Sequence, residues 1–197
     1  MFKRFFDFIF SFLGLIVASP ILALIAFLIK RDSKGPIFYR GLRTGQNGEP
    51  FKIFKFRTMV PDAEKLGGPS TSADDPRLTN VGKFLRKRKL DELPQLINVF
   101  FGQMSVVGPR PEVPSEVETY DQKTKKIILS VKPGMTDLAS LANIHEEEIL
   151  RGSSDPHQTY REVIKSQKLK LAVEYVENRS FWLDIKIILR TLKAAFF

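Results

Sequence analysis

Between Phe8 and Ile29 the chain reads FIFSFLGLIVASPILALIAFLI, and none of these 22 positions carries a charge. At a rise of about 1.5 Å per residue, a helix of this length spans about 33 Å, enough to cross a hydrocarbon core of about 30 Å. The run is longer than the apolar core of a typical signal peptide, and Ala18-Ser19-Pro20 lies in its middle rather than after it. The sequence therefore predicts a membrane helix.

A proline divides this run into two halves. Pro20 lacks an amide hydrogen and clashes with the carbonyl group of Ile16, and the Ser19 hydroxyl can bond a freed backbone group. Basic residues flank both ends, and the positive-inside tendency favours both ends on the cytoplasmic side: Lys3, Arg4, Lys30, Arg31, Lys34, Arg40 and Arg43. We expect residues 1–30 to form a re-entrant helix broken at Ser19-Pro20. A straight or kinked span is the alternative.

The charge balance follows the same division. The 197 residues carry a net charge of +9 and no cysteine, so a thiolate metal site, a disulfide and a cysteine nucleophile are excluded. Residues 1–110 hold 18 Lys and Arg against 9 Asp and Glu, whereas residues 111–197 hold 13 of each. Because the excess accompanies the apolar run, it indicates anionic lipid or phosphate, and no nucleic acid is expected as a partner.

The remaining residues, 31–197, are expected to form one domain of the α+β class, mainly helical. The alternation in Phe51–Arg57 predicts a strand, and Gly45–Gly48 suits the turn of a short β-hairpin. The high content of Pro, Gly, Ser and Asp in residues 61–80 predicts a long loop. Helices are expected over residues 82–90, 94–101, 112–129, 158–177 and 181–197.

The last of these helices is amphipathic. Lys186, Arg190 and Lys193 share one narrow face, and apolar side chains lie roughly opposite. This pattern is typical of a helix that lies in the membrane interface, although a core helix of a globular domain would show it too.

Two adjacent carboxylates, Asp91 and Glu92, follow the basic run Arg86-Lys87-Arg88-Lys89 and precede a helix start. They could simply cap that helix. They could also provide a nucleophile or a magnesium ligand, because an ionised carboxylate can attack phosphorus and form an acyl phosphate. The residues alone leave both interpretations open.

A longer series of motifs narrows the choice. Its members are Lys55-Phe56-Arg57-Thr58-Met59, Asp75-Pro76-Arg77-Leu78-Thr79, Gly82-Lys83-Phe84-Leu85-Arg86, Leu90-Asp91-Glu92-Leu93-Pro94-Gln95-Leu96, Asn98-Val99, Met104-Ser105, Val107-Gly108-Pro109-Arg110-Pro111 and Lys132-Pro133-Gly134-Met135-Thr136. In this order the chain resembles the bacterial sugar transferase family of monotopic polyprenyl-phosphate phosphoglycosyl transferases, in its small form. The resemblance extends from Ser19-Pro20 to Trp182-Leu183-Asp184.

The resemblance implies transfer of a sugar 1-phosphate from a UDP-sugar to undecaprenyl phosphate, with release of UMP, as the first membrane step of glycoconjugate assembly. It implies that Asp91 is the nucleophile and a ligand of Mg²⁺, the cofactor, and that Glu92 manages protons or positions the acceptor phosphate. Arg86 and Lys55 match basic residues of the phosphate site. Arg57 is also expected to bind phosphate. Pro109-Arg110-Pro111 is similar to the segment that recognises the nucleotide.

The resemblance also implies a location at the cytoplasmic face of a bacterial inner membrane, in contact with membrane lipid. One departure concerns the sugar: many members continue after the Pro-Gly-x-Thr turn with Gly-Leu, whereas this chain has Asp137-Leu138. Residues 137–150 are therefore expected to recognise a different sugar. Neither that sugar nor the oligomeric state follows from the sequence. Two alternatives remain: a membrane-bound glycosyltransferase that releases UDP, and a membrane-anchored binding protein without catalysis.

Overall fold

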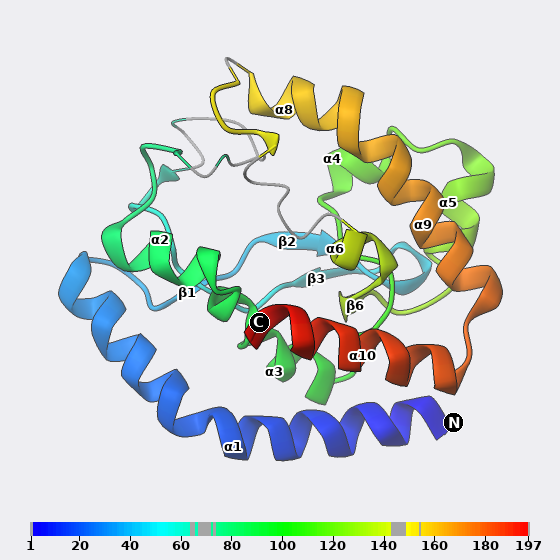
Figure 1. Ribbon diagram of the computed structural model, residues 1–197, viewed down its shortest axis with the longest axis horizontal. Helices are drawn as coiled ribbons and strands as arrows, with labels where there is room; N and C mark the ends of the chain where they lie inside the picture. Colours follow the sequence, from blue (N-terminus) through cyan, green and yellow to red (C-terminus); the bar gives the residue numbers. More distant parts are fainter. Residues whose placement is uncertain are drawn as a thin grey trace.

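The computed structural model describes residues 2–63, 66, 72, 74–142, 149–153 and 155–196 (Figure 1). The helices in this part of the chain are α1 (Phe2–Asp32), α2 (Asn80–Lys87), α3 (Gln95–Phe100), α4 (Pro114–Val117), α5 (Gln122–Ile128), α6 (Leu138–Ala142), α8 (Pro156–Thr159), α9 (Lys165–Asn178) and α10 (Phe181–Phe196). One-turn 3₁₀ segments are η1 (Gln46–Gly48) and η3 (Leu90–Glu92), and η4 (Tyr160–Ile164) is π-helical. The short strands are β1 (Phe38–Tyr39), β2 (Leu42–Thr44), β3 (Pro50–Lys52), β4 (Lys55–Phe56), β5 (Ser105–Val107) and β6 (Gly134–Thr136).

The expected break at Ser19-Pro20 is a bend within one helix. Helix α1 is continuous across Pro20 and changes direction near its middle (Figure 1). The Ser19 hydroxyl donates to the carbonyl oxygen of Ile16 at 2.8 Å. This is the carbonyl that Pro20 cannot bond, so the side chain replaces the missing donor and the helix bends without breaking.

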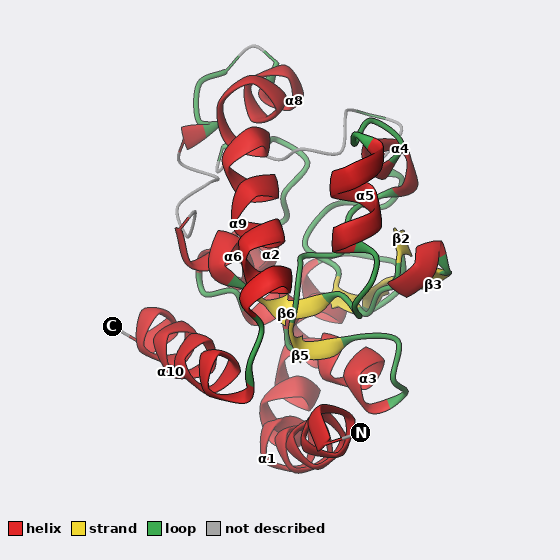
Figure 2. Ribbon diagram, turned by 90° about the vertical axis from the view of Figure 1, so that its right-hand side faces the viewer, coloured by secondary structure: helices red, strands yellow, loops and turns green. Residues whose placement is uncertain are grey.

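Both halves of α1 pack against the rest of the molecule. Near the N-terminus, Arg4 donates to the carbonyl oxygens of Val99 and Phe100 at 2.6 and 2.7 Å, where α3 ends. Beyond the bend, Ile25 and Ile29 are buried against residues of β4 and α2. Helix α1 therefore lies along one side of the molecule, as Figures 1 and 2 show, and does not project from it.

The strands in the described part of the chain form three two-stranded sheets. The expected hairpin is confirmed: β2 and β3 are antiparallel, and Asn47 and Gly48 adopt positive φ in the turn. Strands β5 and β6 are parallel, and a Cβ atom on Gly134 would lie 2.0 Å from the backbone nitrogen of Gly108. Glycine is therefore required where these two backbones meet.

The main core gathers around β5. It contains Phe51, Ile53, Val99, Met104 and Val107 together with Tyr175 of α9 and Ile187 of α10. Phe6 and Phe10 of α1 pack against this core. The long helices α1, α9 and α10 therefore pack around the same short strands (Figure 2).

Two of the expected elements are interrupted. The strand predicted over Phe51–Arg57 is split into β3 and β4, because Asn98 binds the backbone between them. The helix predicted over residues 112–129 is split into α4 and α5, because the Asp121 carboxylate accepts from the Thr124 amide at 3.0 Å and starts a new helix. The helix predicted over residues 158–177 is observed as α8, η4 and α9 in succession.

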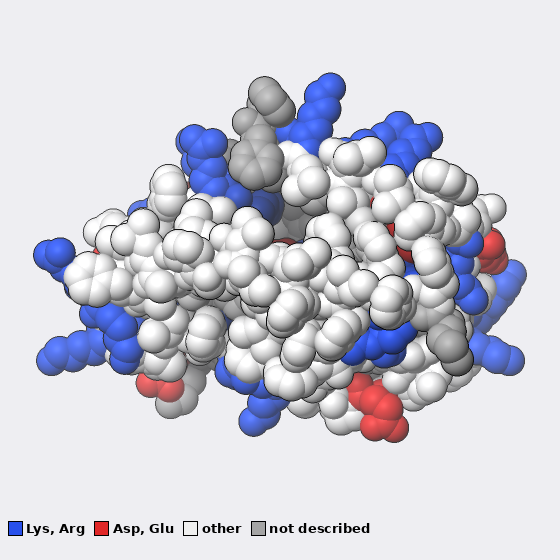
Figure 3. Space-filling model, turned by 90° about the horizontal axis from the view of Figure 1, so that it is seen from below, with Lys and Arg blue, Asp and Glu red and all other residues white. Residues whose placement is uncertain are grey.

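The outer face of α1 is apolar and exposed. Phe5, Val17 and Leu24 are 64%, 80% and 56% exposed. In the most apolar 18-residue stretch of α1, only 11% of the residues are buried. By length and composition this is a helix that could cross a membrane. Seen from below, the molecule shows a broad uncharged surface with lysine and arginine side chains at its edges (Figure 3).

Helix α10 adjoins this face. Ile187 and Ile188 are buried in the main core, whereas Trp182 is 79% and Leu189 62% exposed. The rings of Phe2 and Phe181 pack edge to face, with centroids 5.1 Å apart. Helix α10 is therefore a core helix on one side and continues the apolar surface of α1 on the other.

Candidate active site

The acidic pair lies in a tight connection between two helices. Helix α2 begins at a Thr79 cap, where the hydroxyl accepts from the Gly82 amide at 3.0 Å, and ends in its basic residues. Lys89 then adopts a left-handed conformation, with φ of 54°, and the chain turns into η3. This turn carries Asp91 into the interior, where its residue is only 6% exposed.

Glu92 joins two cations that come from distant parts of the chain. Lys55 Nζ, on β4, lies 2.7 Å from Glu92 Oε1, and Arg110 Nη2 lies 2.6 Å from the same oxygen. The Lys55 and Glu92 side chains are each 17% exposed. The structure therefore assembles Asp91, Glu92, Lys55 and Arg110 into one cluster.

Burial and charge divide the two acids. Burial raises the pKa of Asp91; Lys55, Arg86 and Lys89 lower it without outweighing burial, and the Glu92 charge adds to the increase. Burial also opposes ionisation of Glu92, but Arg110 and Lys55 hold the pKa of Glu92 well below its ordinary value. Glu92 is therefore a permanent anion at neutral pH, and Asp91 is the acid that is more easily protonated.

The carboxylate of Asp91 is open to a further partner. It accepts no hydrogen bond within the part of the chain that the structure describes, whereas Glu92 is engaged by two cations. No cluster of three acidic or histidine ligands occurs among the described residues. Mg²⁺ commonly binds through one or two carboxylates and the phosphates of its substrate, so Asp91 fits such an ion and Glu92 does not.

Asn98 positions the backbone beside Lys55. Its side chain is completely buried, accepts from the Phe54 amide at 2.7 Å and donates to the carbonyl oxygen of Lys52 at 3.0 Å. Lys55 is the next residue in the chain. In the sequence, Asn98 stands out only as part of a motif, because nothing in its neighbourhood indicates which backbone groups an asparagine side chain will reach.

The Pro109-Arg110-Pro111 loop is held by the first residue of β6 and by a residue that directly follows this strand. The Gly134 amide donates to the carbonyl oxygen of Pro109 at 2.9 Å. Asp137, which is 1% exposed, accepts from the Arg110 amide at 3.3 Å and from the Ser140 amide at 2.6 Å. The residue that departs from the family pattern thus supports the loop that carries Arg110, and it also starts α6.

Arg57 lies apart from this cluster. Its guanidinium donates to the carbonyl oxygens of Lys34 and Ser33 at 2.7 and 2.8 Å, and the residue is 7% exposed. Arg57 therefore ties β4 to the end of α1. Ser19 and Pro20 are exposed at the bend in α1.

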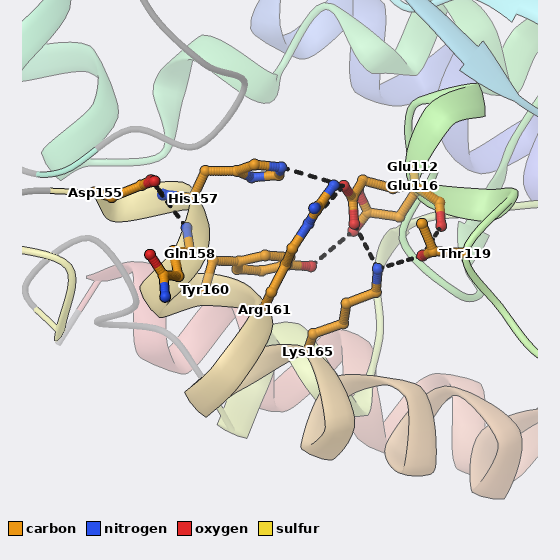
Figure 4. Close-up of polar contacts among 9 residues, drawn as sticks. All are labelled: Glu112, Glu116, Thr119, Asp155, His157, Gln158, Tyr160, Arg161 and Lys165. Atoms are coloured by element: carbon orange, nitrogen blue, oxygen red, sulfur yellow. Dashed lines mark hydrogen bonds and ion pairs between the residues drawn. The ribbon is translucent and has the colours of Figure 1, made fainter.

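A second charged cluster joins α4 to α8, η4 and the start of α9 (Figure 4). Glu116, 4% exposed, accepts from Arg161 Nη2 at 2.6 Å and lies 3.3 Å from His157 Nε2. Lys165 Nζ binds the other Glu116 oxygen at 2.5 Å. Because its partners lie within one continuous helical stretch, this cluster anchors that stretch to the main body. These partners are 41 to 49 positions away from Glu116 in the sequence, so no local pattern indicated the cluster.

Part of the region expected to recognise the sugar, residues 143–148, lies outside the described residues, as does much of the loop predicted over residues 61–80. Of that loop, Asp75 is described and forms an ion pair with Arg77, with 2.7 Å between Oδ2 and Nη2.

The fold and the site together define a mainly helical α+β domain with a candidate membrane helix at its N-terminus and a buried aspartate, Asp91, next to a glutamate that two cations hold in place. The chain belongs to the bacterial sugar transferase family, whose model matches residues 1–197.

Three relatives illustrate this membership. The chain is 42% identical over its whole length to a UDP-glucose:undecaprenyl-phosphate glucose-1-phosphate transferase of Klebsiella pneumoniae, and 39% identical over 98% of its length to the Escherichia coli protein with the same description. This chain spans 40% of the length of each of these two relatives. It is also 36% identical to the exopolysaccharide production protein ExoY of Sinorhizobium fredii, with 98% of this chain and 84% of that protein covered.

Proposed function

We propose that this protein transfers a sugar 1-phosphate from a UDP-sugar to undecaprenyl phosphate and releases UMP. The observation that carries the proposal is the buried Asp91 carboxylate, open to a partner and adjacent to the Lys55–Glu92–Arg110 cluster. The names of the Klebsiella and Escherichia relatives describe such a transfer with glucose 1-phosphate. Glucose is therefore the first sugar to test.

The reaction that suits this geometry is a double displacement. Asp91 attacks the phosphorus next to the sugar, an aspartyl–phosphorus bond forms, and the bond to UMP breaks. The phosphate oxygen of the lipid then attacks the same phosphorus, and the Asp91 carboxylate leaves. Mg²⁺ held by Asp91 and the substrate phosphates would neutralise the diphosphate charge.

Glu92 acts as a positioning residue in this scheme. Because its pKa is held well below the ordinary range, Glu92 does not provide a proton at neutral pH. Its two ion pairs instead place the charges of Lys55 and Arg110 beside Asp91, where a diphosphate would bind. Arg110, whose side chain is 34% exposed, can turn from Glu92 toward the substrate.

We further propose that α1 enters and leaves the membrane by the same face, the cytoplasmic one. Contacts of both helix halves with the domain support this orientation, because a straight span would carry one end away from it. The exposed apolar sides of α1 and α10 would then enter the lipid, and the domain would lie where both substrates are available.

Purified protein incubated with Mg²⁺, undecaprenyl phosphate and UDP-glucose or other UDP-sugars tests the reaction. We expect UMP, formed in the same amount as a lipid-linked sugar diphosphate. Release of UDP would instead indicate a glycosyltransferase, and neither product with any donor would indicate a binding protein. Brief incubation without the lipid should leave a sugar phosphate bound to the wild-type protein and not to Asp91→Asn.

A further inference from the structure

A groove separate from the acidic site lies between α6, α9 and α10. It encloses about 270 Å³. Its apolar part is formed by Leu138, Leu183 and Ile187, and its polar part includes Glu174, Lys186 and Arg190. The groove therefore combines a lipophilic wall with charges of both signs.

The charges in this groove have no ionic partner among the residues that the structure describes. Lys186 and Arg190 lie one turn apart on α10 and are exposed. Neither forms an ion pair or a side-chain hydrogen bond with any residue that the structure describes, and neither reaches Glu174 on the opposite wall. Space for a ligand thus separates two cations from one acid.

The position of the groove indicates which ligands can reach it. Trp182 lies four residues before Lys186 and is 79% exposed, and Leu189 lies three residues after Lys186 and is 62% exposed. These two side chains continue the apolar face of α1. When this face enters a membrane, Lys186 and Arg190 lie at its border, at the depth of the lipid headgroups. A phosphate at that depth belongs to a membrane lipid.

Glu174 restricts the choice further. Two cations and one carboxylate give the groove a net charge of +1, which matches a phosphodiester with one negative charge. Inorganic phosphate and phosphate monoesters, such as a polyprenyl phosphate, carry up to two negative charges, and Glu174 would repel the second charge.

We propose that this groove binds one anionic membrane phospholipid through its phosphodiester. Lys186 and Arg190 donate to the phosphate oxygens, and the start of an acyl chain lies on Leu183 and Ile187. The bound lipid stabilises α10 against α9 and holds the domain at the membrane surface. This site is independent of the transfer reaction.

Native mass spectrometry of the full chain in detergent tests the proposal, with dioctanoyl phosphatidylglycerol as the probe. We expect one tightly retained lipid in the wild-type protein. Removal of each cation should weaken this binding about fivefold, so the variant with Lys186→Gln and Arg190→Gln together should bind about 25-fold more weakly.

Lys193→Gln is the matched control, because Lys193 shares the basic face of α10 and does not line the groove. It should retain the lipid, as should Asp91→Asn. An equal loss in Lys193→Gln would show diffuse attraction and overturn the proposal. Displacement of the lipid by inorganic phosphate at equal concentration would also overturn it, because the site would then bind free phosphate.

The opposite wall offers a second test that does not weaken the cationic side. Glu174→Gln should increase binding of a phosphate monoester probe, dioctanoyl phosphatidic acid, relative to phosphatidylglycerol. An unchanged ratio would contradict the selection of a phosphodiester. Circular dichroism of each variant confirms that the fold is retained.

Discussion

Arg110 and Glu92, 18 positions apart, meet through a hydrogen bond of 2.6 Å between Nη2 and Oε1. This contact joins the loop after β5 to the turn before α3. Since Lys55 binds the same oxygen at 2.7 Å, three separate segments converge on one carboxylate. The acidic pair is thus two residues with opposite electrostatic surroundings, and substitution of each should have a different effect.

Asp91→Asn should abolish transfer and stabilise the protein. Activity should fall by about 10⁴-fold or more, because the nucleophile is lost. Burial raises the pKa of Asp91, so the ionised side chain destabilises the fold above that pKa, and asparagine removes this cost. The thermal midpoint in detergent should rise at neutral pH, and the rise should disappear below the ordinary aspartate pKa of 3.8.

Glu118→Gln, a substitution of an exposed acid, serves as the control and should change neither quantity. An Asp91→Asn protein that still releases UMP at the wild-type rate would exclude Asp91 as nucleophile.

Glu92→Gln should destabilise the protein. The change leaves Lys55 and Arg110 without their counter-charge, and loss of one partner of a buried ion pair costs about 3 kcal/mol. The pKa of Glu92 is depressed, so its stabilisation is fully present above the ordinary glutamate pKa of 4.5 and is lost as pH falls through the depressed value. Denaturant unfolding at pH 7 measures the difference. An increase in stability, as expected for Asp91→Asn, would refute the assignment.

The acidic limb of the pH–rate profile should report Asp91. Transfer needs the carboxylate, so the rate should fall as pH decreases through the raised pKa. Lys89→Gln removes a cation that lowers this pKa and should shift the limb to higher pH.

Lys87→Gln is the matched control for that shift, because Lys87 is also exposed and basic and is not among the main influences on Asp91. Equal shifts in both variants would indicate a general effect of surface charge.

Asn98→Ala should reduce both stability and activity. It leaves the Phe54 amide and the Lys52 carbonyl group without a partner in the interior, at a cost of about 2–4 kcal/mol. Lys55 then loses its fixed backbone, so kcat should fall in whatever protein remains folded. Asn178→Ala removes an exposed side-chain bond and should cost less than about 1 kcal/mol. Unfolding curves and rates at 10 °C separate the two effects.

The topology of α1 can be tested with single cysteines, because the chain has none of its own. Phe2→Cys and Lys34→Cys should react with a membrane-impermeant maleimide from the same side. Labelling from opposite sides would refute the re-entrant orientation. Pro20→Leu restores an amide at the bend and should straighten the helix, which a change in the distance between spin labels at both positions would show.

Local signals were sufficient for much of the fold. The hairpin turn at Gly45–Gly48, the helix that ends before Gly102 and the start of α10 at Ser180 depend on residues that act on their own neighbourhood. The helix predicted over residues 112–129 failed because a capping aspartate within it outweighed helical periodicity. The position of the irregularity at Pro20 was predicted correctly, but the predicted break is only a bend. The Ser19 hydroxyl replaces the hydrogen bond that Pro20 cannot donate, so the helix continues.

By itself, the sequence determined that the chain has an apolar helix bent at Pro20, an adjacent acidic pair after a basic run, and the ordered motifs of its family. These features are encoded by neighbouring residues. Only the tertiary structure decided that Arg57 anchors α1, that Asn98 positions the backbone of Lys55, and that Arg110 and Lys55 share Glu92. The physical reason is that each of these contacts joins residues distant in the chain. Burial selects their partners, because most polar groups in the interior of a protein are hydrogen-bonded.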